Sequence, residues 1–377
     1  MITDIYINNF KSLADFRLPC YSLTCLIGVN NSGKTSILQA IDFLSAIARA
    51  KVGQWLKSRD WKTRQIKSQF KKSRTITFKL CFTLQDKNYS WSGTLNLSSL
   101  SCGSEQIART NSEQTILLRV EKGFYHLGDI KKSIDFEYEG SVLGVLKEQV
   151  LGAELIRIRH FLRSVKTLEL LNPRLLRKRA RTAEGDLGIG GEKLSAFLYT
   201  LPEEKKQHIH KQMQRLFDEF DDYDIKARHS GWKELRIYER FENLSENGLF
   251  PLPSSTEAKH VSDGFLRILA IFSQLQTDHS VLLFDEIEDG LNHEVMEYLM
   301  DEMVRATQQI FLTTDSPMIL NFLDDDIAKK SVMLVYRDSQ TGKTQTYKFF
   351  DIPRIREKLE YMGPGEVFAN ASLKELP

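Results

Sequence analysis

The residues best suited to chemistry lie in LIGVNNSGKTS, residues 26–36. This segment matches the spacing G-x-x-x-x-G-K-[ST] with Gly28, Gly33, Lys34 and Thr35. In such a loop the glycines let backbone N–H groups wrap a phosphate, the lysine reaches the β- and γ-phosphate oxygens, and the hydroxyl holds Mg²⁺. The apolar stretch before the loop predicts a strand, and the periodic stretch after it predicts a helix. The segment therefore predicts a nucleotide site.

A second Gly-Lys-Thr, in TGKT at 341–344, lacks this context. The position five residues before Gly342 is Arg337, not glycine, and the flanks SVMLVYR and TQTYKFF alternate like two strands. That pattern predicts a hairpin turn rather than a second nucleotide site.

An acidic pair follows the apolar run in VLLFDEIEDG. Four apolar residues predict a buried strand that ends at Asp285 and Glu286. In doubly wound sheets ligands lie at the carboxyl ends of the strands. Asp285 is suited to order the shell of Mg²⁺ and Glu286 to polarise an attacking water. The alternative is an acidic pair that caps the next helix.

Between these motifs lies HVSDGFLRILAIF. Ser262 is a good N-cap for the apolar helix that Asp263 and Gly264 begin, and the N–H groups behind it form an anion-binding helix end. The segment is either a capped core helix or a motif that binds the γ-phosphate of a nucleotide held by another subunit.

Composition sets the broad class. The chain has 377 residues and a formal net charge of +2, and none of its apolar runs approaches the ~20 residues that cross a bilayer. The amphipathic start MITDIYINNF is expected to be a strand, not a signal peptide. The four cysteines are not spaced as a C-x-x-C motif: Cys20, Cys25, Cys81 and Cys102. We therefore expect reduced, mostly buried thiols in a cytoplasmic protein. We expect no membrane partner.

Positive charge is concentrated in two segments. Residues 51–74 contain nine Lys or Arg against Asp60, and residues 157–181 contain nine against Glu169. Such segments either neutralise nucleic-acid phosphates or form solvated helix faces. Trp55 and Trp61 in the first segment are equally suited to a core or to stacking on bases.

The element pattern predicts an α/β fold with strands at both ends of the chain. From residue 262 helix, strand, helix and strand alternate, which indicates a parallel sheet. We predict a mixed β lobe, a parallel P-loop core and a helical insertion. The expected divisions are a first lobe at 1–142, a helical insertion or short arm at 143–222, and a second lobe at 223–377 that carries the SDG, DE and TTDSP segments and a C-terminal hairpin.

The order of these motifs resembles the head of ABC-type ATPases, in the branch that contains RecF, SMC and the OLD-type ATPases of anti-phage systems. The opening NNFKSLADFRLPCYSLTCLIGVNNSGKTSILQAIDFL is similar to that family's opening, and GEKLSAFLYTLPEE and VSDGFLRILAIFSQL are similar to its later segments. The resemblance implies ATP and Mg²⁺ as ligands and ATP hydrolysis as the activity.

The resemblance also implies roles for individual residues. Lys34, Asp285 and Glu286 would be catalytic, with Asp285 as the Walker B acid and Glu286 as the base, and Thr35 and Asp285 would hold the metal. Ser262 and Gly264 would form the signature that acts in trans, and Asp289 would lie in the D-loop. The remaining nucleotide contacts would come from the loop itself: Gly28, Asn30, Asn31, Ser32, Gly33, Lys34, Thr35 and Ser36.

One position departs from the family. Where the family has the histidine of TTHSP, a switch residue at the γ-phosphate, this chain has Asp315 in TTDSP. A carboxylate near neutral pH cannot donate to phosphate and repels it. Asp315 is therefore expected to slow ATP turnover, unless it turns away to cap the helix after Pro317.

The resemblance implies partners as well. Heads of this kind form homodimers or higher oligomers around ATP. OLD-type enzymes carry a nuclease domain after the head, whereas here about sixty residues follow TTDSP, so we expect a separate effector, a nuclease or toxin. The chain resembles the ATPase subunits of two-gene anti-phage systems such as PARIS and Septu, and the PARIS ATPase most of all.

Two other functions stay open at this stage. One is a RecF- or SMC-like ATPase that binds double-stranded DNA in repair or recombination. The other is a transporter's nucleotide-binding subunit, which the large insertion and the Ser-Asp-Gly signature disfavour.

Overall fold

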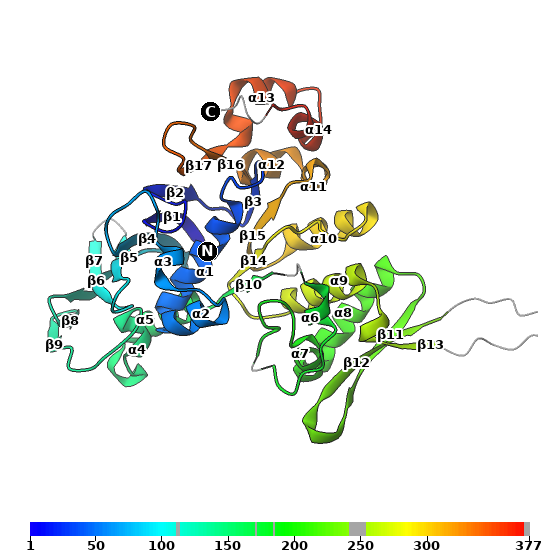
Figure 1. The fold of residues 1–377 in the computed structure, drawn as a ribbon, viewed down its shortest axis with the longest axis horizontal. Coiled ribbons are helices and arrows are strands. Elements are labelled where there is room, and N and C mark those ends of the chain that lie inside the picture. The colour runs from blue at the N-terminus through cyan, green and yellow to red at the C-terminus, as the bar shows by residue number, and fades with distance from the viewer. Residues whose placement is uncertain (111–113, 170–171, 184, 241–253, 373–377) are drawn as a thin grey trace, which may run out of the picture. The chain divides into compact units, whose positions relative to one another are not determined.

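The structure is a computed structural model, which describes residues 1–110, 114–169, 172–183, 185–240 and 254–372. These residues fold into two compact units. The first consists of Met1–Lys166, His279–Leu283 and Thr307–Pro377, and the second of Thr167–Asp278 and Phe284–Ala306. Figure 1 labels the elements of both.

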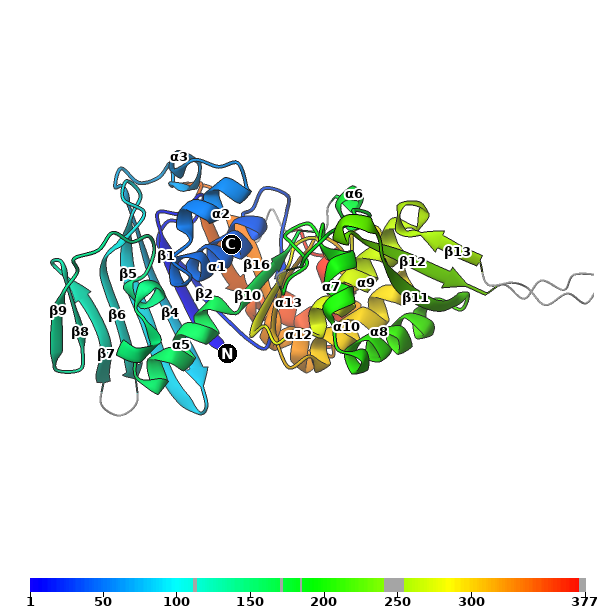
Figure 2. The same ribbon diagram turned by 90° about the horizontal axis from the view of Figure 1, so that it is seen from below.

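An antiparallel sheet of eight strands is the larger sheet of the first unit (Figure 2). Alternate residues of β4 (Thr75–Leu84) are buried, which is the period that places one face of a strand on a core. The sheet order is β2 (Phe16–Pro19), β1 (Ile2–Asn8), β4, β5 (Lys87–Asn96), β6 (Cys102–Thr110), β7 (Gln114–Glu121), β8 (Phe124–Leu127) and β9 (Ile130–Ser133).

A six-stranded sheet has the order β10 (Val165–Leu168), β14 (Val281–Phe284), β15 (Gln309–Thr314), β3 (Leu23–Ile27), β16 (Val332–Arg337) and β17 (Thr344–Lys348). Strand β3 pairs in parallel with β15 and with β16, and β17 closes the edge as an antiparallel hairpin. All residues of β3, β14 and β15 are buried, as expected for strands covered on both faces.

Helix α1 (Lys34–Ala48) is the central helix of the first unit, and every residue from Ile37 to Ala48 is buried. Its apolar side chains share one core with both sheets; that core includes Leu26 of β3 and Phe78 of β4.

Asp42, a polar residue on this buried helix, accepts hydrogen bonds from the Trp55 indole at 2.6 Å and from the Arg59 guanidinium at 2.8 Å. The unit's other helices are α2 (Val52–Ser58), α3 (Thr63–Ile66), α4 (Val142–Val145), α5 (Ala153–Arg163), α11 (Pro317–Asn321), α12 (Asp325–Ser331), α13 (Pro353–Lys358) and α14 (Pro364–Ala369).

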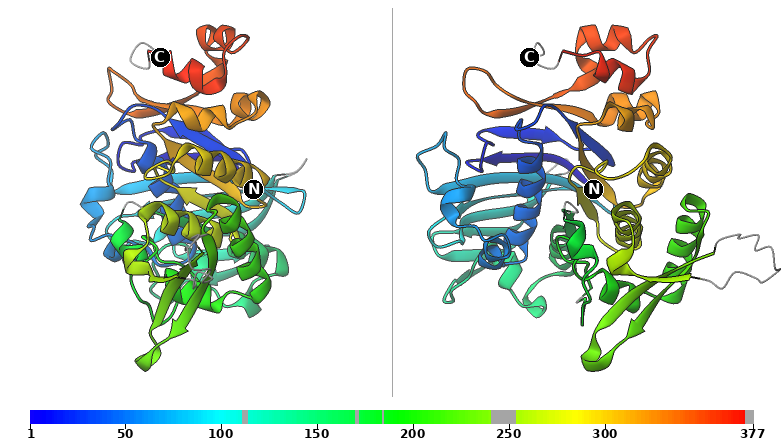
Figure 3. Two further views of the ribbon diagram at one scale, coloured as in Figure 1. Left: turned by 90° about the vertical axis from the view of Figure 1, so that its right-hand side faces the viewer. Right: turned by 45° about the vertical axis from the view of Figure 1, so that its right-hand side comes forward.

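The second unit combines helices with a three-stranded antiparallel sheet, in the order β11 (Phe220–Ala227), β12 (Lys233–Glu239) and β13 (Ser254–Glu257). The green β11–β12 hairpin is visible in Figure 3. Helix α9 (Asp263–Leu275) is the core helix, because its residues from Phe265 to Gln274 are all buried. The other helices are α6 (Pro173–Leu176), α7 (Leu194–Thr200), α8 (Glu203–Leu216) and α10 (His293–Arg305).

The predicted α/β class is confirmed, with its parallel P-loop sheet and its second, antiparallel sheet. The helix, strand, helix and strand from residue 262 are α9, β14, α10 and β15. The segment around TGKT is the predicted hairpin turn, between β16 and β17. One element was missed, because the stretch from 143 to 220 was expected to be helix-rich and contains strand β10, an edge of the six-stranded sheet. Four residues are too short a run for a period to show.

Three of the cysteines, Cys20, Cys25 and Cys102, are buried and Cys81 is half-buried, all as free thiols. Among the described residues, none of the helices combines the length and the apolarity needed to cross a membrane.

Candidate nucleotide site

The predicted phosphate loop leaves the carboxyl end of β3 and turns into α1. Gly28 has φ +148° and Gly33 has φ +113°, conformations that side chains disfavour. A Cβ atom at Gly28 would clash with the carbonyl oxygen of Val335, and one at Gly33 would clash with Thr344. Both glycines are therefore required by the backbone path and by the neighbouring hairpin.

Lys34 is the first residue of α1, and its side chain is 8% exposed. Its ammonium group donates to the carbonyl oxygens of Gly28 at 2.7 Å and of Val29 at 3.3 Å. The loop thereby curls around its own lysine. Because the first N–H groups of a helix have no acceptor within the helix, the start of α1 also offers donors and a positive dipole end to an anion.

Asp315 follows β15 directly, next to the phosphate loop, because Thr314 is in register with Ile27 of β3. One oxygen of its carboxylate, Oδ1, lies 2.6 Å from the Lys34 ammonium, and the side chain is 40% exposed. The N-cap of α11 is the next residue, Ser316. The Asp315 carboxylate thus contacts the lysine that we expect a nucleotide phosphate to contact. That Asp315 slows ATP turnover stays a prediction.

The β16–β17 hairpin is hydrogen-bonded to the phosphate loop. The sequence analysis did not predict this contact. The Thr344 hydroxyl donates to the Ser32 carbonyl oxygen at 2.8 Å, and its oxygen lies 2.8 Å from the Ser12 hydroxyl, within hydrogen-bond distance. Arg337 donates to the Asn31 side-chain oxygen at 3.2 Å. TGKT, set aside as a nucleotide motif, therefore contributes the threonine that anchors the true loop. No local signal in the sequence marks this contact, since the partners are about 310 residues apart in the chain.

The other predicted loop residues differ in exposure. Asn30, Asn31 and Thr35 are exposed, Ser36 is half-buried and Ser32 is buried. Asn31 has φ +65°, a left-handed conformation that asparagine tolerates better than most residues. Thr35 is thus open to a metal or phosphate. Among the described residues no group of three His, Cys, Asp or Glu is arranged to hold a metal ion.

Asp285 and Glu286 belong to the second unit and follow the buried strand β14. Asp285 is 8% exposed, whereas Glu286 is exposed and has φ +49°. A left-handed conformation costs a residue other than glycine about 1 kcal/mol or more. The turn after β14 therefore presents one shielded and one accessible carboxylate.

The signature residues also lie in the second unit. The Ser262 hydroxyl accepts from the Phe265 N–H at 3.3 Å and so caps α9, as predicted. A Cβ atom at Gly264 would lie 2.8 Å from the Gly290 carbonyl oxygen, so only glycine allows this close approach. Arg267, 4% exposed, donates to the carboxylate of Asp289 at 2.8 Å and to its carbonyl oxygen.

Within this unit the signature and the predicted D-loop are therefore one assembly. Sequence reasoning assigned no role to Arg267. Its position three residues after Gly264 is a local signal, because residues i and i+3 are neighbours on one face of a helix.

Some residues of the basic segments make structural contacts. In the first, Trp55 is 7% exposed and packs on Phe43, and Arg59 pairs with Asp42 at 2.8 Å. In the second, Arg159 is buried against Glu148 at 2.6 Å, and Arg163 donates to the carbonyl oxygens of Ala48 and Gly144. The core alternative holds for Trp55, and these arginines stabilise the fold.

Residues 23–321 match the profile of a protein family described as "AAA domain, putative AbiEii toxin, Type IV TA system". The chain belongs to this AAA family. None of the curated proteins compared with the chain matches it significantly.

Solved structures similar to this AAA-family chain include SMC heads. One is an SMC head bound to the C-terminal winged-helix domain of ScpA, with 13% identity, a TM-score of 0.56, and coverage of 92% of this chain and 96% of that chain. Another is an SMC head with an extended coiled coil bound to the C-terminal domain of ScpA derived from Pyrococcus furiosus, with 12% identity, a TM-score of 0.55, and coverage of 95% and 99%. At these identities the likeness establishes the fold alone, which is that of an SMC head.

Proposed function

We propose that this chain binds and hydrolyses ATP at the loop from Gly28 to Ser36. The observation that carries the proposal is the placement of Lys34, whose buried ammonium group lies at the start of α1 and contacts two loop carbonyl oxygens and the Asp315 carboxylate. A phosphate there would gain a desolvated cation and several backbone donors, which are the strong partners of anions. Membership of the AAA family and the SMC-head fold support this assignment.

The hydrolytic step would use the carboxylates after β14. Glu286 is accessible and would take a proton from the attacking water. The shielded Asp285 and Thr35 would be the residues that hold Mg²⁺, which would supply electrostatic stabilisation of the charge that develops on the phosphates.

Two copies of the chain would meet head to head, with ATP between them. In that arrangement Ser262 and the N-terminal amides of α9 would contact the γ-phosphate bound by the other copy. The Ser262 hydroxyl accepts a hydrogen bond from Phe265, so its own proton remains suited to donation to a phosphate oxygen. Asp289, fixed by Arg267, would lie next to the subunit interface.

We further propose that the ATPase is a sensor or scaffold for a separate effector, a nuclease or toxin, in a cytoplasmic bacterial anti-phage system. Two observations support this role. The family description refers to a toxin of a type IV system, and the SMC head of one similar structure is bound to a second protein. The PARIS ATPase subunit, which holds a toxin-like nuclease until a phage protein is sensed, is the specific role we propose.

The decisive experiment combines two variants. Lys34→Ala should abolish ATP binding in equilibrium titrations, because the phosphates lose their main side-chain cation. Glu286→Gln should bind ATP, stop hydrolysis and accumulate an ATP-dependent dimer in light scattering, because an amide cannot accept the proton of water. Unchanged ATP affinity in Lys34→Ala would refute the nucleotide site, and unchanged turnover in Glu286→Gln would assign the base to another residue.

A further inference from the structure

The loop Glu257–Asp263 determines where Ser262 lies. It runs from the last residue of β13 to the first residue of α9. A group that contacts a phosphate in the transition state must be held within a fraction of an ångström, since small displacements of catalytic groups cost large factors in rate. The contacts that hold this loop therefore bear on the signature, and the inference drawn from them rests on the proposed function.

Arg177 holds the C-terminal end of the loop. Its Nη2 group donates to the Val261 carbonyl oxygen at 2.7 Å and forms an ion pair with the Asp263 carboxylate. These acceptors lie on either side of Ser262, and the Arg177 side chain is only 22% exposed. One guanidinium thus fixes the residues before and after the signature serine.

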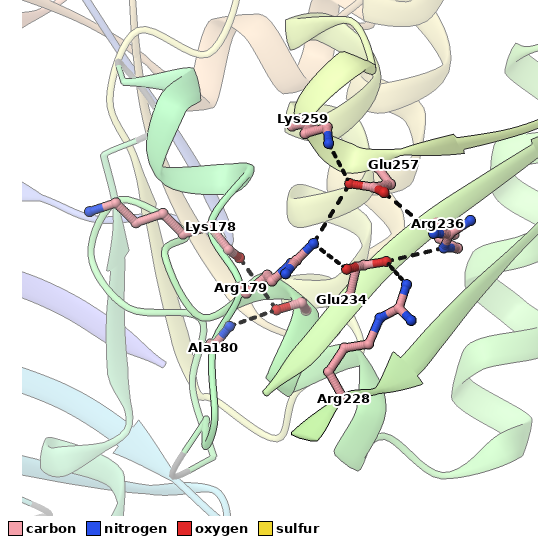
Figure 4. A network of polar contacts seen from close by, with 9 residues as sticks. Lys178, Arg179, Ala180, Arg228, Glu234, Arg236, Glu257 and Lys259 are labelled. Atoms are coloured by element: carbon pink, nitrogen blue, oxygen red, sulfur yellow. Dashed lines mark hydrogen bonds and ion pairs between the residues drawn. The ribbon is translucent and has the colours of Figure 1, made fainter. Parts of the chain in front are cut away.

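Arg179 holds the opposite end of the loop. Its guanidinium pairs with Glu234 and lies 3.7 Å from the Glu257 carboxylate (Figure 4). Glu257 is also bound by Lys259 at 2.9 Å and by Arg236 at 3.4 Å. The segment Arg177–Arg179 therefore spans the signature loop from its first residue to its last.

Glu234 connects this segment to the three-stranded sheet. Its side chain is 3% exposed and accepts hydrogen bonds from Arg228 at 2.6 Å and from Arg236 at 3.1 Å. These contacts lower the pKa of the Glu234 carboxyl to about 2, so it is ionised at neutral pH. The backbone adds a further tie, because the Lys233 N–H donates to the Ala180 carbonyl oxygen at 2.8 Å. Glu234 and this backbone hydrogen bond therefore hold Arg179 and its segment against β12 of the three-stranded sheet.

We propose that Arg177 and Arg179 are positioning residues for Ser262. Neither arginine touches a nucleotide in this scheme. Both act through the signature loop, so their removal should impair the step that needs Ser262 and spare nucleotide binding at Lys34.

The segment contains its own control. Lys178 lies between the two arginines, and its side chain extends away from the network (Figure 4). Lys178→Ala removes one positive charge from the same segment but leaves the contacts of Arg177 and Arg179 with the loop in place. Thermal melts of all three alanine variants would show that each is folded.

The first measurement is amide hydrogen exchange without nucleotide. The Phe265 and Leu266 N–H groups donate to the hydroxyl and the carbonyl oxygen of Ser262, both at 3.3 Å. Loss of a brace should raise the exchange rates of these amides about threefold or more in Arg177→Ala and Arg179→Ala. Equal exchange in these variants and in Lys178→Ala would overturn the proposal.

The second measurement separates binding from turnover. We expect Arg177→Ala to bind ATP within about twofold of the unmodified chain but to lose about tenfold in kcat, because only the transition-state contact is displaced. Arg177→Lys, which can reach one acceptor, should recover part of the loss. An equal decrease in ATP affinity and kcat, or an unchanged kcat, would overturn the positioning role. If the unmodified chain hydrolyses no ATP, the proposed function fails by itself, and the exchange result still decides whether the arginines position the loop.

Discussion

The substitution Asp315→Asn tests whether the carboxylate after β15 competes with ATP. Asp315 lies 2.6 Å from the Lys34 ammonium, so a nucleotide phosphate must displace it or share the cation with it. Asparagine keeps the size of the side chain and removes the charge. It can also donate to a phosphate oxygen, which an ionised carboxylate cannot do.

The magnitude follows from the exposure of the pair. Two unit charges 4 Å apart interact by about 1 kcal/mol in water and about 4 kcal/mol at an effective dielectric of 20. Asp315 is 40% exposed, so solvent screens it and the lower part of this range applies. A gain of about 1–2 kcal/mol corresponds to ATP binding that is about fivefold to thirtyfold tighter.

The assay is equilibrium titration with ATP and with ADP. We expect the gain to be larger for ATP, because the γ-phosphate adds charge near residue 315. Asp15→Asn is the matched control, since Asp15 forms an exposed ion pair with Lys71 at 2.7 Å in the same unit. It should leave ATP affinity unchanged.

A folded Asp315→Asn variant that binds ATP no more tightly than the unmodified chain would refute the competition. In that case Asp315 yields to the phosphate at no cost. Asp315→His, which restores the residue of the resembling family, extends the test to turnover: if the carboxylate slows hydrolysis, the basal rate should rise about tenfold.

Two further predictions concern stability. Gly28→Ala should lower the free energy of unfolding by about 3 kcal/mol or more in urea titrations, because its Cβ atom would strike the Val335 carbonyl oxygen. Gly123→Ala, at φ +78° with open space around it, should cost only about 1 kcal/mol, and equal losses would contradict the clash. The lowered pKa of Glu234 predicts that its stabilising contribution is complete above its ordinary pKa of 4.5 and disappears as the pH falls to about 2. Glu234→Gln should therefore be less stable than the unmodified chain at pH 6, by a margin that narrows between pH 4.5 and 2, and a constant margin would exclude this linkage.

Several features of this protein could be predicted from local sequence, because the relevant physics acts over short stretches. The spacing of Gly28, Gly33 and Lys34 specifies a phosphate loop, and apolar runs before Asp285 and Asp315 specify buried strands. Ser262 before an apolar period specifies a helix start, and the structure has this cap. The α/β class follows from the alternation of such elements.

Other features depended on the tertiary structure. They are contacts between residues that are far apart in the chain, and a local sequence pattern does not predict such contacts. Strand β10 is identified by its place at the edge of a sheet, and its four residues show no period of their own. Thr344 supports the phosphate loop only because β16 pairs with β3. The sequence marked Asp315 as unusual but left open whether it turned toward the loop or capped a helix, and the register of β15 on β3 decided that it lies on Lys34. In the sequence, Arg177 and Arg179 are two charges in a basic stretch. Only the fold shows that they contact the two ends of the signature loop, at Asp263 and Glu257.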